Sequence, residues 1–172
     1  LGGTLYLVAT PIGNLADLSD RARKVLSEVD FIAAEDTRNT RAMLTHFDIH
    51  RELVSYHEHN KEARGPELVA RILRGESCAL VTDAGMPAIS DPGEDLVKLC
   101  IENDITVTSI PGPVAGINAL ILSGLPTGRF AFEGFLTVNR KNRLSHLESL
   151  KNDERTLIFY EAPHKLMTTL KD

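Results

Sequence analysis

Residues 81–93 read Val81-Thr82-Asp83-Ala84-Gly85-Met86-Pro87-Ala88-Ile89-Ser90-Asp91-Pro92-Gly93, and this stretch decides the fold. It follows an apolar run at 78–81 that is typical of a buried strand, and it precedes an amphipathic segment at 94–100 that predicts a helix. A loop between strand and helix in an open α/β sheet lies at the carboxyl edge, where such folds bind ligands. Its glycines allow a ligand to approach the backbone, and its prolines stiffen the path. An ordinary turn-rich loop explains the composition equally well.

Composition limits the classes of protein to which this chain can belong. Its 172 residues suffice for one domain, or for one domain and part of another. Hydrophobic residues make up 42% and charged residues 25%, as in soluble globular proteins, and no apolar run is long enough to cross a membrane. A net charge of -5 argues against a protein that coats nucleic acid, but it is compatible with a local basic site.

Cysteine usage and the chain start bear on the compartment and on the extent of the sequence. Cys78 and Cys100 fall in a predicted strand and a predicted helix, where a reduced and buried thiol is the default, and this favours the cytoplasm. The first residues, 1–4, form neither a signal peptide nor a natural initiator. We therefore expect a few N-terminal residues to be missing or vector-derived.

Strands, loops and helices alternate along the first two thirds of the chain. Predicted strands lie at 4–9, 31–34, 53–56, 78–81 and 106–110. One helix is predicted after an N-cap at Ser19, and the next from about 40 to 46. Three more are predicted: one that ends at Gly75, one at 94–100 and one that ends near Gly124. This alternation predicts an α/β fold with a parallel sheet and right-handed crossovers.

The pattern changes after residues 125–128. Strands are predicted at 130–135 and 156–160, with a basic loop at 139–143, a helix through 144–150 and a short helix after Pro163. We interpret this part as the opening of a second α/β domain that is cut off before its sheet is complete. The expected division is an N-terminal domain at 1–113 and an incomplete C-terminal domain at 114–172.

Four segments at strand ends form a set that is more specific than any one of them. They read VATPIGNL at 8–15, DAGMPAISDPG at 83–93, IPGPVA at 110–115 and LIFYEAP at 157–163. Their order and spacing resemble the tetrapyrrole methylase superfamily, which are S-adenosylmethionine-dependent methyltransferases with two α/β domains and the donor bound between them. Together with EDTR at 35–38, they are most similar to the branch that methylates a cytidine 2′-oxygen in small-subunit ribosomal RNA. The resemblance covers nearly the whole chain.

The resemblance implies a set of residues around the methyl donor, S-adenosylmethionine. The matching positions are Pro11, Asp83, Ala84, Gly85, Met86, Pro87, Ile89, Pro111, Val114, Ala115, Tyr160 and Glu161. Met86 replaces an aspartate of the relatives, so only the backbone role carries over there. Glu161 replaces a neutral contact with a carboxylate. Asp83 and Asp91 flank the donor loop, and side-chain bonds that stabilise turns explain both equally well.

The candidate catalytic residues are expected on the acceptor side of the donor. Because the donor methyl is electrophilic, the enzyme must align an oxygen and help remove its proton, and no metal is required. Arg38 would clamp an RNA phosphate while Asp36, beside Glu35, accepts the proton. Alternatively, Asp36 or Thr37 caps the next helix and Arg38 pairs with Glu35. His57 is a further acceptor-side candidate, and the histidines near it lack companions for a zinc site.

A compact basic patch completes the set of candidates. Arg140, Lys141 and Arg143 fall in a predicted loop, where they are either solvated or in contact with RNA phosphates. The resemblance implies small-subunit ribosomal RNA or the assembled 30S subunit as partner, and a homodimer. Two alternatives remain: a methylase of a tetrapyrrole or another small acceptor, which Met86 and Glu161 disfavour, and a nucleotide-binding module without catalysis.

Overall fold

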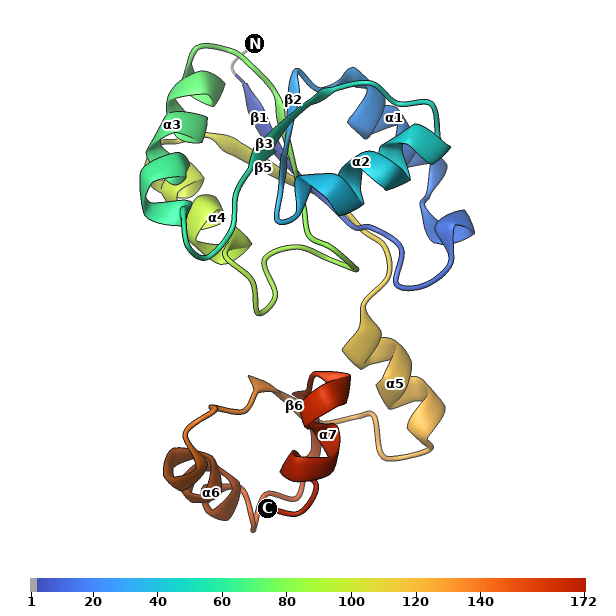
Figure 1. Ribbon diagram of the computed structural model, residues 1–172, viewed down its shortest axis with the longest axis vertical. Coiled ribbons are helices and arrows are strands. Elements are labelled where there is room, and N and C mark those ends of the chain that lie inside the picture. Colours follow the sequence, from blue (N-terminus) through green and yellow to red (C-terminus); the bar gives the residue numbers. More distant parts are fainter. Residues whose placement is uncertain (1–2) are drawn as a thin grey trace. The chain divides into compact units, whose positions relative to one another are not determined.

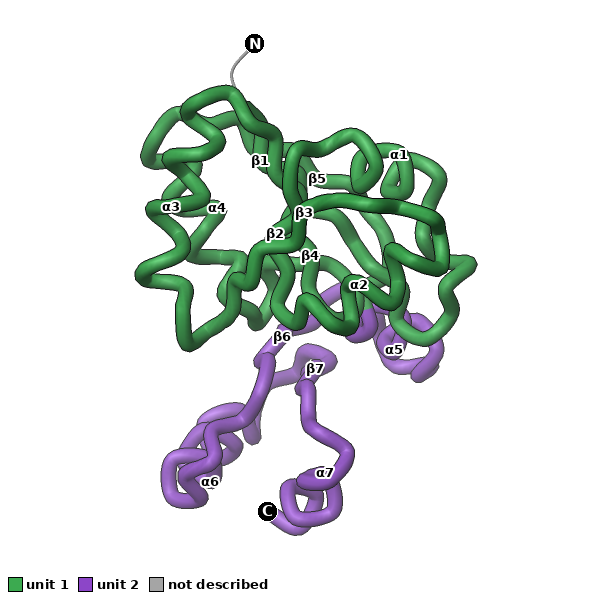
Figure 2. The backbone as a smooth tube through the Cα atoms, turned by 45° about the horizontal axis from the view of Figure 1, so that its top comes forward, with its two compact units in different colours: residues 1–114 green, residues 115–172 purple. Residues whose placement is uncertain are grey.

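The computed structural model describes residues 3–172, which form two compact units (Figure 2). The first unit is Leu1–Val114 and the second is Ala115–Asp172. The expectation about the chain start concerns in part Leu1 and Gly2, which lie outside the described residues. No helix within residues 3–172 is long and apolar enough to span a membrane.

The first unit is built on one parallel sheet of five strands, which confirms the predicted α/β class. The strands pair in the order β3-β2-β4-β1-β5, and all four pairings are parallel. Their bounds are Thr4–Val8 for β1, Phe31–Ala34 for β2, Glu52–Ser55 for β3, Cys78–Val81 for β4 and Thr106–Ile110 for β5. Because β2 and β4 are covered on both faces, every residue in them is buried and apolar.

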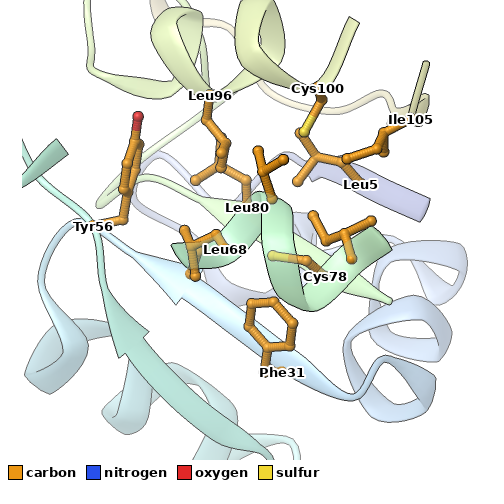
Figure 3. Close-up of a cluster of buried hydrophobic side chains, with 12 residues drawn as sticks. Leu5, Phe31, Tyr56, Leu68, Cys78, Leu80, Leu96, Cys100 and Ile105 are labelled. Atoms are coloured by element: carbon orange, nitrogen blue, oxygen red, sulfur yellow. The ribbon is translucent and has the colours of Figure 1, made fainter. Parts of the chain in front are cut away.

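Helices cover both faces of this sheet (Figure 1). On one face lie α1 (Asp20–Glu28) and α2 (Thr37–His46), and on the other lie α3 (Lys61–Leu73) and α4 (Gly93–Glu102). Figure 3 shows the core beneath α3 and α4, where Leu80 and Leu96 pack with the two cysteines. Cys78 and Cys100 are free and buried as predicted, and burial raises the pKa of both thiols, that of Cys100 to about 11.

The path of the chain through the sheet fixes where a ligand can bind. From β1 the chain crosses to β2 on one side, and from β4 it crosses past β1 to β5 on the other side. The adjacent strands β1 and β4 therefore form a topological switch point, and the crevice at their carboxyl ends is the preferred ligand site in such folds. The 81–93 stretch leaves β4 at this point.

The caps explain where the helices on the α1 and α2 face begin. Ser19 is the N-cap of α1, as predicted, and its hydroxyl accepts a hydrogen bond of 3.1 Å from the N–H of Ala22. The helix predicted from about residue 40 begins at Thr37, because Asp36 supplies an N-cap that the apolar pattern does not reveal. Gly75, with φ +102°, ends α3 as predicted, donating to the carbonyl of Ile72.

The second unit contains α5 (Ala115–Ser123), β6 (Phe130–Phe135), α6 (Arg140–Ser149), β7 (Thr156–Tyr160) and α7 (Pro163–Thr169). The strands β6 and β7 pair in parallel, with a register shift between Phe132 and Gly134. The prediction of a basic loop at 139–143 is wrong, because α6 already begins at Arg140. Asn139 caps this helix and accepts a hydrogen bond of 3.1 Å from the N–H of Asn142.

Candidate functional site at the carboxyl edge of the sheet

Two loops meet at the switch point between β1 and β4. We call residues 9–14 the β1 loop and residues 82–92 the β4 loop. Thr10 and Gly85 exchange two backbone hydrogen bonds of 3.0 Å, and the buried hydroxyl of Thr10 donates to the carbonyl of Thr82 at 3.1 Å. The two loops are therefore fixed to one another before any ligand binds.

Glycines bring a third loop, residues 111–114 after β5, against the first two. Gly85 has φ +86°, and a Cβ on it would lie 3.2 Å from the carbonyl oxygen of Pro113 and 3.4 Å from Cγ2 of Ile12. A Cβ on Gly112 would lie 2.6 Å from Cβ of Ala9. Because Gly85 and Gly112 carry no side chain, the three loops approach one another closely in one place.

A carboxylate holds the far half of the β4 loop in an unusual conformation. Asp91 Oδ1 accepts hydrogen bonds from the N–H groups of Ala88 (2.9 Å) and Gly93 (2.8 Å), and Oδ2 accepts from Ile89 (3.3 Å). Ala88 and Ser90 have φ of +67° and +59°, which is strained for residues with a Cβ. The turn-stabilising alternative therefore describes Asp91.

A pocket of about 360 Å³ opens beside the β1 loop, and we call it the edge pocket. Its lining consists of Thr10, Pro11, Gly13 and Asn14 from the β1 loop, Leu15 directly after that loop, Asn39, Ala42 and Met43 from α2, and Asp83 from the β4 loop. Two other hollows lie at the amino edge of the sheet. One, of about 400 Å³, is lined by Asp30 and Glu52 at the starts of β2 and β3, and the other, of about 680 Å³, is lined by Thr106 at the start of β5. Ligands of open α/β sheets bind at the carboxyl edge, so the edge pocket is the better candidate.

The carboxylates after β2 are held by hydrogen-bond donors. Thr82 Oγ1 donates to Glu35 Oε2 at 2.7 Å. Asp36 caps α2 by accepting from the N–H of Arg38 at 2.8 Å, and the Arg38 guanidinium donates to it at 2.9 and 3.2 Å. These bonds lower the pKa of Asp36 to about 2. The capping alternative is thus present, although Arg38 pairs with Asp36 and not with Glu35.

Asp83, after β4, is in a different electrostatic state. The Asn39 amide donates to Asp83 Oδ2 over a long 3.4 Å. Partial burial raises the pKa of Asp83, and the negative charge of Glu35 raises it further. Asp83 is among the residues expected beside the donor from the sequence, and Asn39, Ala42 and Met43 are not. Their spacing along one helix was a usable signal, but the 44-residue separation of Asn39 and Asp83 has no local signature.

His57 does not join the edge pocket. It follows β3, at the edge of the sheet, and is not among the residues that line the pocket. Its backbone N–H donates to Asn60 Oδ1 at 2.8 Å, and its buried Nδ1 has no hydrogen-bond partner among the described residues. Within residues 3–172, no group of three histidine, cysteine or acidic side chains is arranged to hold a metal ion.

In the second unit, two of the three residues expected at the donor, Tyr160 and Glu161, have side-chain partners within that unit. The Tyr160 hydroxyl accepts a hydrogen bond of 2.9 Å from the N–H of Gly116, next to Ala115. The Glu161 carboxylate accepts from the Thr169 hydroxyl and from the N–H of Ala162, both at 2.7 Å, and these bonds lower the pKa of Glu161.

The basic patch is largely neutralised by an acidic residue of the same unit. Arg143 is buried, and its guanidinium donates to Asp172 Oδ2 at 2.5 and 2.9 Å. Arg140 contacts Asp172 Oδ1 at 2.8 Å. Lys141 is exposed and has no ion-pair partner in the described part of the chain. Of the three cations, Lys141 is therefore the one available to an external anion.

Comparison with curated proteins gives sequence matches over nearly the whole of this chain. Residues 4–172 match the family model of tetrapyrrole (corrin/porphyrin) methylases. Proteins named ribosomal RNA small subunit methyltransferase I are similar to this chain over 99% of its length. The identity is 58% in Halalkalibacterium halodurans, 55% in Synechocystis and 49% in Escherichia coli O157:H7. The chain spans 59–61% of the length of these three relatives.

Solved structures share the fold at low sequence identity. A diphthine synthase aligns with a TM-score of 0.66 at 17% identity, covering 94% of this chain and 66% of its own. Uroporphyrin-III C-methyltransferase of Thermus thermophilus aligns with a TM-score of 0.56 at 24% identity, covering 77% of this chain and 60% of its own. The resemblance and the fold class expected from the four loop motifs are confirmed, and this chain belongs to the tetrapyrrole methylase family.

Proposed function

We propose that this protein is an S-adenosylmethionine-dependent methyltransferase that methylates the ribose 2′-hydroxyl of a cytidine in small-subunit ribosomal RNA. The observation that carries the proposal is the 58% identity, over 99% of the chain, to a relative named ribosomal RNA small subunit methyltransferase I. The two structural units then correspond to the two domains of the family. We further propose that the protein acts in the cytoplasm, which its free and buried cysteines favour, and as a homodimer, as the family resemblance implies.

The first unit offers a surface that suits the amino-acid end of the donor. That end carries an ammonium and a carboxylate, which backbone carbonyls and N–H groups can bind. The exposed Ala84 can offer such groups. The N–H and carbonyl of Gly85 are bonded to Thr10, so Gly85 contributes by letting the loops after β1 and β5 approach closely. When bound, S-adenosylmethionine supplies an electrophilic methyl group. A solved relative, the Thermus thermophilus uroporphyrin-III C-methyltransferase, is described in complex with S-adenosylhomocysteine.

The other donor residues are proposed at neighbouring positions of the same loops. In the β4 loop these are Met86, Pro87 and Ile89, of which Pro87 is buried and Ile89 is exposed. Pro11, Pro111 and Val114 are the proposals from the other two loops. In the second unit Ala115, Tyr160 and Glu161 are proposed through their backbone or ring, since the polar atoms of Tyr160 and Glu161 already have partners.

The acceptor is proposed to enter the edge pocket. Pro11, Leu15 and Met43 provide apolar wall for a base or sugar, and Asn14 and Asn39 provide amide groups for its hydroxyls. Arg38 is proposed as a phosphate contact because its side chain is 89% exposed at the start of α2. Lys141 is the corresponding candidate in the second unit, where Arg140 and Arg143 are held by Asp172.

Donor binding is the first test. Calorimetric titration of this chain with S-adenosylmethionine and S-adenosylhomocysteine is expected to give saturable binding of both. The matched control is a Gly85→Val variant, in which the β-branched side chain is incompatible with φ +86° and with the neighbouring carbonyl of Pro113. Saturable binding to the wild type and not to a folded Gly85→Val variant would support the backbone cradle.

Methyl transfer to different acceptors tests the substrate. The chain spans about 60% of its relatives, so the assay includes a chimera that continues it with the remaining segment of the Halalkalibacterium halodurans relative. Labelled methyl is expected in 30S subunits or their RNA, at a cytidine that becomes resistant to alkaline cleavage on its 3′ side. Incorporation into a porphyrinoid instead would favour a small acceptor, and donor binding without any transfer would favour the non-catalytic module.

A further inference from the structure

Glu35, Asp36 and Asp83 directly follow β2 and β4 at the carboxyl edge, and the first two are poor candidates for the base that methyl transfer to a hydroxyl requires. Glu35 holds the Thr82 hydroxyl at 2.7 Å, and Asp36 holds the N–H and the guanidinium of Arg38. Each donor stabilises the carboxylate anion and so weakens it as a proton acceptor. Asp83 accepts a long 3.4 Å contact from the Asn39 amide and an interaction with the backbone of Asp36, and neither outweighs the effects that raise its pKa.

The position of Asp83 separates it from the other two acids. Asp83 lines the edge pocket, whereas Glu35 and Asp36 are not among its lining residues. It also directly precedes Ala84 and Gly85, where the proposed donor surface begins. In methyl transfer, the attacking oxygen must lie about 3–3.5 Å from the carbon, and the base must lie within hydrogen-bond reach of that oxygen. A base therefore has to stand where the acceptor and donor surfaces meet.

We propose that Asp83 is the catalytic base that accepts the proton of the acceptor 2′-hydroxyl. This inference rests on the proposed function and assigns to Asp83 the role that the sequence suggested for Asp36. In the transfer the hydroxyl oxygen bonds to the methyl carbon, and the carbon–sulfur bond breaks with its electron pair remaining on sulfur. The hydroxyl proton passes to Asp83, and the uncharged thioether leaves.

The electrostatic surroundings of Asp83 favour this role. Partial burial and the charge of Glu35 raise its pKa, and the charge of Asp36 adds to the rise. The contacts from the Asn39 amide and from the backbone of Asp36 offset part of it. A carboxylate with a raised pKa is a stronger base and accepts a proton more readily, and shifted pKa values of this kind are common at active sites. Asp83 is also exposed to solvent, so the accepted proton can leave to water.

The test compares three aspartate-to-asparagine variants in the chimera, with 30S subunits or their RNA as the acceptor. Asp83→Asn removes the proposed base, Asp36→Asn removes the competing one, and Asp20→Asn is the matched control, since the Asp20 side chain is 91% exposed on α1. We expect Asp83→Asn to lower kcat about 100-fold. The Kd for S-adenosylmethionine, measured by calorimetry, should stay within twofold, which a loss of loop structure would not allow.

The pH profile provides a second, independent readout. Wild-type kcat is expected to rise about tenfold per pH unit below the raised pKa of Asp83, and this limb should disappear in Asp83→Asn. A kcat within threefold of wild type in Asp83→Asn, or a larger loss in Asp36→Asn, would overturn the inference. A wild-type chimera that transfers no methyl to either acceptor would instead refute the proposed function, and with it this role of Asp83.

Discussion

The ends of β2 and β4 are adjacent in the sheet and both are acidic, yet their carboxylates differ in the hydrogen bonds that they accept. After β2, the acids hold donors: Glu35 holds Thr82, and Asp36 holds Arg38 while capping α2. After β4, Asp91 is used in the same structural way, whereas Asp83 stands in the edge pocket with a raised pKa. The comparison teaches that hydrogen-bond donors within reach, and not the residue type, distinguish a structural carboxylate from one that is free to react.

The strongest effect on stability is expected from Asp91→Ala. It removes the acceptor of three backbone N–H groups in a partly buried loop that contains two strained residues. We expect a loss of about 2–3 kcal/mol in the free energy of unfolding, measured with urea. Asp17→Ala, at an exposed position, is the control and should change stability by less than about 0.5 kcal/mol. Equal effects of the two variants would mean that Asp91 does not hold the loop.

A smaller effect is expected from Asp36→Ala, which removes the cap of α2. Loss of a cap of this kind lowers the Tm of a chain of this size by about 2–4 °C. Because the pKa of Asp36 is lowered to about 2, its stabilising charge is present above its ordinary pKa near 3.9 and is lost as the pH falls towards 2. The difference in Tm from wild type should therefore narrow over that interval.

Asp36→Asn separates the cap from the charge. The amide oxygen can still accept from the N–H of Arg38, so this variant should keep part of the stability at pH 7 but lose the pH dependence. A difference from wild type that is constant from pH 5 to pH 2 would contradict the assignment.

The smallest effect, of opposite sign, is expected from Asp83→Asn. A raised pKa means that the folded state binds the proton more tightly, so the associated stability is present at low pH and is lost as the pH rises through the raised pKa. The asparagine variant should therefore have a Tm about 1–2 °C above wild type at pH 7 and no advantage near pH 3. A lower Tm at pH 7 would show that Asp83 stabilises the fold instead.

Much of the first unit was predictable from sequence because its signals are local. The apolar runs located all five strands, and Ser19 and Gly75 marked helix ends through their own backbone or side-chain chemistry. The apolar pattern alone placed the start of α2 too late, although Asp36 was considered as a cap, and it missed the start of α6 at Arg140. Each start is set by one capping side chain, Asp36 or Asn139, within a run of polar residues.

The candidate site was predictable as a set of loops but not as a set of roles. The motifs placed Asp83, Gly85 and Pro111 at one edge, and the structure brings their loops together there. How strongly each acid is hydrogen-bonded depends on partners such as Thr82 for Glu35, 47 residues away, and Asn39 for Asp83, 44 residues away. Pairings over such distances are set by the strand order of the sheet, which a single sequence does not specify.

The hydrogen bonds between Thr10 and Gly85, with the bonds to Asp91, have a kinetic consequence. A β4 loop that is already folded needs no ordering step when the donor arrives. Stopped-flow association should then show one exponential phase whose rate rises linearly with donor concentration, without the plateau that a slow rearrangement imposes. Differences in affinity among donor analogues would then arise from their dissociation rates. The residence time of the product would determine how soon the next turnover begins.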